Sequence, residues 1–288
     1  MGNLFKAFLF RLKRDLTFRI TLIIGGALAI VITLIYFAID LSISEIADGA
    51  DNLDHMFCNG QSMLINSVSP AQNFGLAIPI NLITFTVLEF TQGTIRNKII
   101  TGNSKGKIYF GLLFSGLVFT ILLIVTYVGL CVGIGSIIGG FDAHGTILAG
   151  LSASQITPEF IWKFIVLVVL VYVLIACVTI FFATLFRSIG PSIPVVIILI
   201  IMCYFSATVV GSLGMIEDLS DIFKNLAKIM MYVNPLYSLS AYDTVSTAEG
   251  SLLTITNQAF ISQIINNVVY IAAFTVGGWL IFRKRDVK

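Results

Sequence analysis

Long apolar runs alternate with short polar segments along the whole chain, and few charged residues interrupt the runs. A helix needs about 20 apolar residues to cross the hydrocarbon core of a bilayer, and most of the runs approach or exceed that length. We therefore predict an all-α integral membrane protein with a single transmembrane domain over residues 1–288. Its six predicted membrane-spanning helices cover residues 20–39, 74–90, 109–138, 160–186, 191–213 and 264–282.

The second and third runs differ from an ordinary span. The second is short, is interrupted by Pro79 and ends at Glu89. The third would be roughly 45 Å long as a helix, against about 30 Å of hydrocarbon core. We expect it to bend, or to pack closely against a neighbour, where its small residues gather at Gly129, Gly133, Gly135, Gly139 and Gly140.

Residues 1–18 precede the first run and have the pattern of an interfacial amphipathic helix. Their apolar side chains share one face of a helical wheel, namely Leu4, Phe5, Phe8, Leu9 and Leu12. Their basic side chains, which we expect to lie at the anionic membrane surface, are Lys6, Arg11, Lys13 and Arg14. The alternative interpretation is a basic flank that only orients the first span.

The distribution of charge predicts the orientation of the chain. If both termini are cytosolic, every Lys and Arg except Lys163, Lys224 and Lys228 lies inside the cell, whereas most Asp and Glu lie outside. This bias follows the positive-inside rule, so we expect a multi-pass protein of the plasma membrane with cytosolic N- and C-termini. Residues 214–262 would then form an external loop, with a short helix at about residues 221–231.

Composition excludes several classes of protein. A chain that is 57 % hydrophobic and only 11 % charged cannot hide its apolar side chains in a water-soluble fold. Its net charge of +2 gives no basis for a nucleic-acid partner. Of the four cysteines, Cys58 alone falls in an external loop, where we favour a free thiol over an intermolecular disulfide.

The polar stretch between the second and third runs has the pattern of a short two-sided helix. Thr94 is a suitable N-cap, and Gly102 suits the left-handed residue that ends a helix. Its isoleucines gather on one side, whereas Arg96 and Lys98 point elsewhere, towards an acidic partner or lipid headgroups. The residues leave open whether this is a docking element for another protein or a turn that only holds topology. It comprises Gly93, Thr94, Ile95, Arg96, Asn97, Lys98, Ile99, Ile100, Thr101 and Gly102.

Glu89 ends the second run and is the acidic residue closest to this stretch. A carboxylate is costly in hydrocarbon, so we expect Glu89 at the cytosolic boundary, paired with a neighbouring Arg or Lys. A proton relay would need acidic or histidine companions at membrane depth, and the other runs supply none.

The remaining sequence gives no pattern of catalysis. His55 and His144 lie in external loops without metal-ligand spacing, and no span contains a histidine that could activate a serine. The chain also lacks a Gly-x-x-x-x-Gly-Lys-[Ser/Thr] phosphate loop. We therefore predict no catalytic residue, no metal site and no cofactor on this chain.

Residues 89–109, EFTQGTIRNKIITGNSKGKIY, resemble the segment between the second and third spans of ABC exporter permeases of the type-2 class. In that family an acidic residue ends the second span and a coupling helix with a similar Gly-Thr-Ile-Arg-Asn-Lys sequence follows. Weaker similarities are the basic amphipathic start, six spans with both ends inside, and Asn234-Pro235-Leu236 before the final span.

The resemblance implies a transmembrane subunit without enzymatic activity of its own. It would pair with a second permease subunit, as a homodimer or heterodimer, and with two cytosolic ABC ATPase subunits that bind ATP and Mg²⁺. Residues 93–102 would sit in a groove on the ATPase, and the N-terminal helix would help to hold it. The complex would export an amphipathic or hydrophobic substrate, with a peptide as the favoured cargo. The alternatives are a non-transporting scaffold or immunity protein that binds its ligand, and an ion-coupled carrier.

Overall fold

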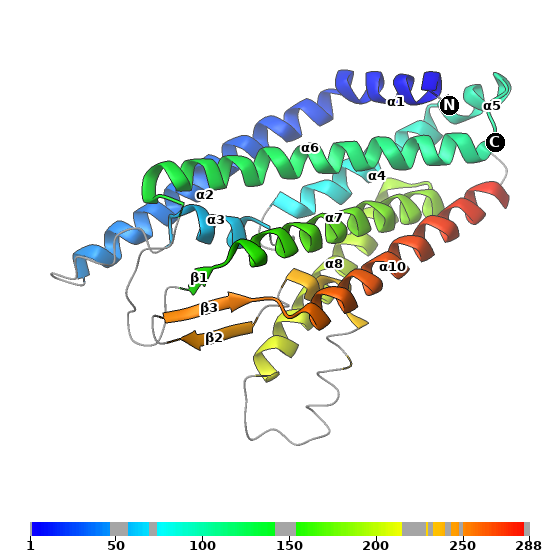
Figure 1. Ribbon diagram of the computed structural model, residues 1–288. Helices are drawn as coiled ribbons and strands as arrows, with labels where there is room; N and C mark the ends of the chain where they lie inside the picture. The colour runs from blue at the N-terminus through cyan, green and yellow to red at the C-terminus, as the bar shows by residue number, and fades with distance from the viewer. Residues whose placement is uncertain are drawn as a thin grey trace.

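The structure, a computed structural model, describes residues 2–46, 57–68, 74–141, 154–214, 229, 233–239, 243–247 and 250–284. Long helices dominate this part of the chain (Figure 1). In chain order the helices are α1 (Gly2–Arg14), α2 (Leu16–Ile46), α3 (Gly60–Ser67), η1 (Phe74–Leu76), α4 (Ala77–Thr91), α5 (Thr94–Ile100), α6 (Lys105–Gly139), α7 (Pro158–Phe186), α8 (Ile189–Gly214), η2 (Pro235–Leu239) and α10 (Asn257–Lys284). The strands are β1 (Ser154–Ile156), β2 (Asp243–Thr247) and β3 (Gly250–Thr254).

Five of the described helices, α2, α6, α7, α8 and α10, are long and apolar enough to cross a membrane. The chain is therefore a helical multi-pass membrane protein. The remaining predicted span, the second one over residues 74–90, corresponds to α4, whose 15 residues would cover only about 22 Å. Pro79 lies in the first turn of α4, where a missing N–H has no intrahelical partner to lose, so the expected interruption is wrong.

A break at Asp15 separates the amphipathic helix from the first long helix. The Asp15 backbone N–H still donates to Arg11 O at 2.9 Å, whereas the Asp15 carboxylate accepts from Thr17 N at 2.9 Å. A carboxylate at this position satisfies one of the N–H groups that the start of a helix leaves without a partner. The predicted helix over residues 1–18 therefore ends at Arg14, and α2 begins at Leu16.

Helix α7 lies at the centre of the bundle. In its most apolar stretch 67 % of the residues are buried, compared with 28 % or less in the other four long helices. It packs against α10, α4, α6 and α8, and its side chains contribute much of the main hydrophobic core. The outer helices leave large apolar side chains exposed on their other faces, as expected of surfaces that meet lipid.

Helix α3 is a short buried helix that the sequence analysis missed. Asn59 caps it by accepting from Ser62 N, and its Met63 side chain packs against Gly135 of α6. An added Cβ at Gly135 would lie 2.6 Å from Met63 Cγ, whereas at Gly129 or Gly133 it would meet no described atom within 4 Å. Close packing of the glycine-containing half of α6 is therefore confirmed at Gly135.

A small three-stranded sheet follows the order β1-β3-β2, with β1 parallel and β2 antiparallel to β3. Its registers pair Gln155 with Leu252 and Val245 with Leu252. The fold remains that of an all-α membrane protein, and these strands, which lie outside the long helices, were not predicted. No alternating apolar pattern marked them in the sequence, because each is so short.

The two ends of the helical bundle differ in character (Figure 1). Helices α1 and α5 lie at one end with the last turn of α10, and the sheet lies at the other. Lys105 Nζ donates to Arg283 O at 3.2 Å and so joins the start of α6 to the end of α10. The helix predicted at residues 221–231 falls outside the described residues except at Ile229, and both histidines lie outside them as well.

Candidate functional site: the Glu89 junction

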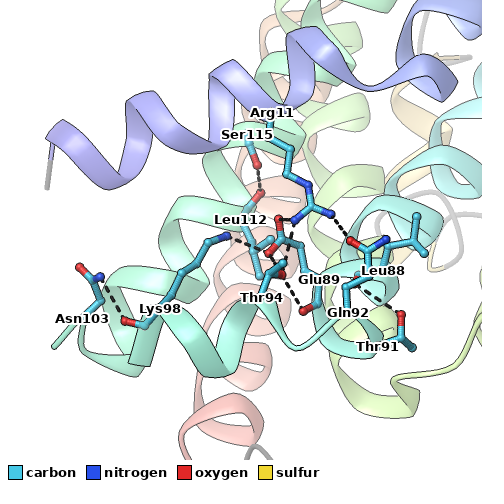
Figure 2. A network of polar contacts seen from close by, with 10 residues as sticks. All are labelled: Arg11, Leu88, Glu89, Thr91, Gln92, Thr94, Lys98, Asn103, Leu112 and Ser115. Atoms are coloured by element: carbon cyan, nitrogen blue, oxygen red, sulfur yellow. Dashed lines mark hydrogen bonds and ion pairs between the residues drawn. The ribbon is translucent and has the colours of Figure 1, made fainter. Parts of the chain in front are cut away.

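Glu89, near the end of α4, is completely buried and has three side-chain donors around it. Arg11 Nη1 lies 2.6 Å from its Oε1, and Lys98 Nζ lies 2.8 Å from its Oε2. The Thr94 hydroxyl also donates to Oε2 (Figure 2). A buried carboxylate is tolerated only when it is paired and hydrogen-bonded, and both conditions are met here. The expected pairing of Glu89 with a neighbouring cation is confirmed.

Arg11 brings α1 into this site. Besides Glu89, its guanidinium donates to Gln92 Oε1 at 2.9 Å and to Thr94 Oγ1 at 3.4 Å. A single planar side chain from α1 therefore contacts both the end of α4 and the start of α5. We call the group Arg11, Glu89, Gln92, Thr94 and Lys98 the Glu89 junction.

Lys98 approaches Glu89 from α5. Its ammonium lies 3.6 Å from the centre of the Phe8 ring of α1, a cation–π contact. Burial lowers the pKa of Lys98 below its usual value, and the nearby Glu89 carboxylate opposes this effect only in part. Lys98 is thus a structural member of the junction, and the expectation that it meets a partner protein or lipid headgroups is wrong.

The start of α5 differs from the sequence-based prediction. Gly93 is the N-cap residue, with a left-handed φ of 67°, and Thr94 is the first residue of the helix. The Thr94 hydroxyl does not cap the helix but donates to the backbone O of Glu89 at 2.9 Å and to its carboxylate. Thr94 already lies inside the helix, and its hydroxyl donates to the buried charge of Glu89 instead of accepting from a helix N–H, so the N-cap role expected for Thr94 is wrong.

The end of α5 agrees with the prediction. Gly102 has a φ of 86°, which lies in the left-handed region, and its N–H donates to Ile99 O at 2.9 Å. Asn103 donates to Lys98 O from both its backbone and its side chain, at 3.2 and 3.1 Å. These bonds satisfy carbonyl groups that the helix end leaves open.

Helix α5 has an inner and an outer face. Ile95 is fully buried and belongs to the main hydrophobic core, and Ile99 packs beside it half-buried. Arg96 and Asn97 are exposed, and the side chain of Ile100 is 72 % exposed. The Glu89 junction and Ile95 therefore hold α5 against the bundle while its outer face stays open.

Helix α1 is more closely attached to the protein than a surface helix would be. Phe8 and Leu12 are buried in the main hydrophobic core, so part of the predicted lipid-facing side contacts protein. Lys6, Lys13 and Arg14 are exposed as predicted. Arg11 was expected to contact the anionic membrane surface, but its guanidinium is paired with the buried Glu89 carboxylate instead.

Two further polar sites lie towards the sheet end. Asp40, buried at the outer part of α2, accepts from the backbone N–H groups of Phe57 and Cys58 at 2.8 and 2.7 Å. Cys58 is buried and has a free thiol. Burial is the main cause that raises the pKa of this thiol to about 11, and the charge of Asp40 adds to it.

Lys163 is the second of these sites. It is 4 % exposed and donates to Ile255 O at 2.9 Å. Neither site was predicted from the sequence. The charged residues Asp40 and Lys163 at the ends of apolar runs could have indicated them, but their partners could not be identified without the fold.

The fold and the Glu89 junction define a multi-pass helical membrane protein with a short helix fixed beyond the ends of its long helices. Residues 61–288 match a protein family described as "Protein of unknown function (DUF2705)". The chain belongs to this family. The matched region contains Glu89 and all of α5 but begins after Arg11, and a comparison with curated proteins gave no match.

Proposed function

We propose that this chain is the transmembrane subunit of an ATP-driven exporter of the ABC type-2 class in the plasma membrane. The observation that supports the proposal most strongly is the attachment of α5. Its inner face is fixed by Ile95 and by the buried Glu89 carboxylate, and its outer face presents Arg96, Asn97 and Ile100. A turn that only connected two spans would not require a buried carboxylate with three donors from two other helices, α1 and α5.

Force applied to α5 has a short path into the bundle. Lys98 and Thr94 belong to α5, Glu89 belongs to α4, and Arg11 belongs to α1. Because all of these groups meet at one carboxylate, displacement of α5 displaces the end of α4 and pulls on α1. In the proposed transport cycle, a cytosolic ATPase moves α5 as it binds and hydrolyses ATP with Mg²⁺.

The proposed assembly contains two ATPase subunits and a second permease subunit. The termini, α1 and α5 are cytosolic in this arrangement, which places the basic residues of α1, α5 and the end of α10 on the inner side. The cargo is amphipathic or hydrophobic, because the spans are apolar and supply no charged side chain at their centres. We favour a peptide, since the stretch that the proposed orientation places outside carries Glu45, Asp48, Asp51 and Asp54, and these acidic residues attract cationic molecules.

Co-purification with an ABC ATPase encoded by a neighbouring reading frame tests the proposal. The variants Arg96→Glu and Ile100→Asp change exposed side chains, so they leave the bundle intact, whereas a change at buried Ile95 would disturb the core. Ile137→Asp is the control, because Ile137 is an exposed isoleucine at the other end of α6. We expect both α5 variants, but not the control, to lose the ATPase and ATP-dependent export.

The same experiment separates the alternatives. A scaffold or immunity protein would bind its ligand without an ATPase, and its binding would be unchanged by Arg96→Glu. An ion-coupled carrier would support flux driven by a pH gradient in the absence of ATP. Either result would contradict the exporter proposal.

A further inference from the structure

A cavity of about 340 Å³ lies between α7, α8, α10 and the segment around η2. It is lined near the middle of each long helix, by Ile175 and Val178 of α7, by Leu199 and Cys203 of α8, and by Phe274 of α10. Known small-molecule sites have volumes of roughly 300–1,000 Å³, and an apolar cavity of about 150 Å³ already accepts benzene. The cavity is therefore large enough to hold a small molecule or one segment of a larger one.

The polar groups at this cavity are already engaged with the protein. Asn234 Nδ2 donates to Cys203 O at 2.6 Å and to Ser206 Oγ at 2.9 Å, and Asn234 Oδ1 accepts from Leu236 N at 2.9 Å. The Tyr270 hydroxyl donates to Val233 O at 3.1 Å. These bonds hold Val233 and Asn234 against α8 and α10 and satisfy the backbone O of Val233 and the backbone N–H of Leu236 there. The described lining that remains is hydrocarbon, with the Cys203 thiol as a small apolar group.

The chemistry of the walls determines what can fill the space. None of the described lining residues carries a charge, and the polar side chains are occupied, so water would find few partners and the cavity favours an apolar occupant. The lining residues of α7, α8 and α10 lie near the middle of helices that are long and apolar enough to cross the membrane, where the surrounding solvent is lipid hydrocarbon. Val233, at the edge of the cavity, is 55 % exposed, so the space reaches the surface of the described structure.

We propose that this cavity binds one acyl chain of a bilayer phospholipid. The lining offers no group that would select a cargo by its head, whereas an acyl chain needs only apolar walls and is present at high concentration around the protein. The chain enters between α8 and α10 beside Val233 and Tyr270 and packs against the buried wall of α7. It fills a gap that would otherwise weaken the contacts between these three helices.

Photolabelling of the purified full-length chain tests this proposal without ATP or an ATPase. The chain is reconstituted in phosphatidylcholine–phosphatidylglycerol vesicles that contain a phosphatidylcholine with a diazirine at the end of one acyl chain. Mass spectrometry then maps the labelled residues. We expect label concentrated at residues 199–206 and 270–274 and saturation as the labelled lipid is increased.

Two substitutions on neighbouring positions of α8 give a matched pair. Leu199 lines the cavity, whereas Ile198 is 55 % exposed on the outside of the helix. A tryptophan at Leu199 would displace about two methylene groups of a bound chain, so Leu199→Trp should reduce labelling there by roughly a factor of ten. Ile198→Trp should leave it unchanged. Phe274→Ala enlarges the space and should increase labelling, which keeps the test valid if Leu199→Trp fails to fold.

Uniform labelling of all exposed helices, unaffected by Leu199→Trp, would mean that the lipid is only part of the boundary layer and would overturn the proposal. An absence of label at residues 199–206 and 270–274 would do the same, because it would mean that protein or cargo occupies the cavity. Neither result bears on the docking role of α5, which is measured by ATPase binding.

Discussion

Arg11 and Glu89 are 78 positions apart in the chain, yet Arg11 Nη1 and Glu89 Oε1 are separated by only 2.6 Å. This ion pair joins the amphipathic N-terminal helix to the end of α4, and Lys98 joins α5 to the same carboxylate at 2.8 Å. In the described part of the chain, neither Arg11 nor Lys98 has another carboxylate within ion-pair distance. The charge of Glu89 is therefore what holds α1 and α5 together at the end of α4.

The first prediction concerns Glu89→Gln, which leaves Arg11 and Lys98 facing each other without a counter-ion. Breaking a buried ion pair costs about 3–5 kcal/mol of unfolding free energy, and we expect about 3 kcal/mol because Arg11 is 31 % exposed. For a chain of this size that lowers Tm by roughly 6–12 °C, measurable by thermal unfolding in detergent.

Glu159→Gln is the matched control for Glu89→Gln. Glu159 pairs with Lys163 at 2.7 Å, but its side chain is 66 % exposed. Exposed pairs contribute about 1 kcal/mol or less, so Tm should fall by no more than roughly 4 °C. Equal effects of the two substitutions would contradict the structural role of the Glu89 junction.

Gly60→Ala should destabilise the contact between α3 and α6. A Cβ at Gly60 would collide with Ser136 Oγ and would lie 2.7 Å from Phe141 Cδ2 and 3.1 Å from Phe141 Cα. Because a backbone atom is among these neighbours, we expect a loss of about 1–3 kcal/mol in the free energy of unfolding. Gly133→Ala meets no described atom within 4 Å and should be neutral or slightly stabilising, so urea unfolding of the pair provides the comparison.

The Cys58 thiol should make stability decline at alkaline pH. Its pKa rises from 9.0 to about 11 on folding, so the folded chain keeps this proton longer than the unfolded chain does. The resulting stabilisation is complete below pH 9.0 and is lost as the pH rises through about 11. The difference in unfolding free energy between wild type and Cys58→Ala should shrink over this range. A difference that does not change with pH would contradict the buried position of the thiol.

Lys163→Met should loosen the attachment of β3 to α7. The Lys163 ammonium donates to Ile255 O at 2.9 Å and to Asn257 Oδ1 at 2.8 Å, immediately after β3. Loss of these charge-assisted bonds costs about 2 kcal/mol locally. Hydrogen exchange of the backbone amides in residues 250–257 should accelerate in this variant. If exchange in residues 250–257 is unchanged and exchange elsewhere is faster, Lys163 does not stabilise this segment.

Hydropathy predicted the long helices well but not their polar ends. The last span was predicted from residue 264, whereas α10 begins at Asn257. Gln263, just before the predicted start, is buried against protein and so belongs to the helix despite its polarity. The cost of burying Glu89 predicted that a cation would accompany it. The sequence could not show that Arg11 would be this cation, because Arg11 reaches Glu89 only when α1 packs near the end of α4. The buried helix α3 and the three strands are too short to give a periodic signal.

Part of α5 was also predictable from the sequence. Gly102 predicted that α5 ends just before it, and Ile95 and Ile99 predicted the inner face. Ile100, which was expected on the same side, lies on the outer face. The roles of Thr94 and Lys98 were mistaken, because both side chains turn towards a carboxylate that precedes them in the chain. Local pattern predicts a helix and its faces, but not the tertiary charge to which its polar side chains respond.

Crosslinking from the outer face of α5 tests whether this helix contacts an ABC ATPase. A benzophenone maleimide is attached to Asn97→Cys in a Cys203→Ala background, since Asn97 is exposed and the other three cysteines are buried. Cells expressing this variant are irradiated, and the products are identified by mass spectrometry beside the control Ile137→Cys. We expect Asn97→Cys, and not Ile137→Cys, to capture an ABC ATPase with a phosphate-binding loop, and we expect the addition of Arg96→Glu to abolish capture. Capture of lipid alone, or of the same proteins at both positions, would contradict this contact.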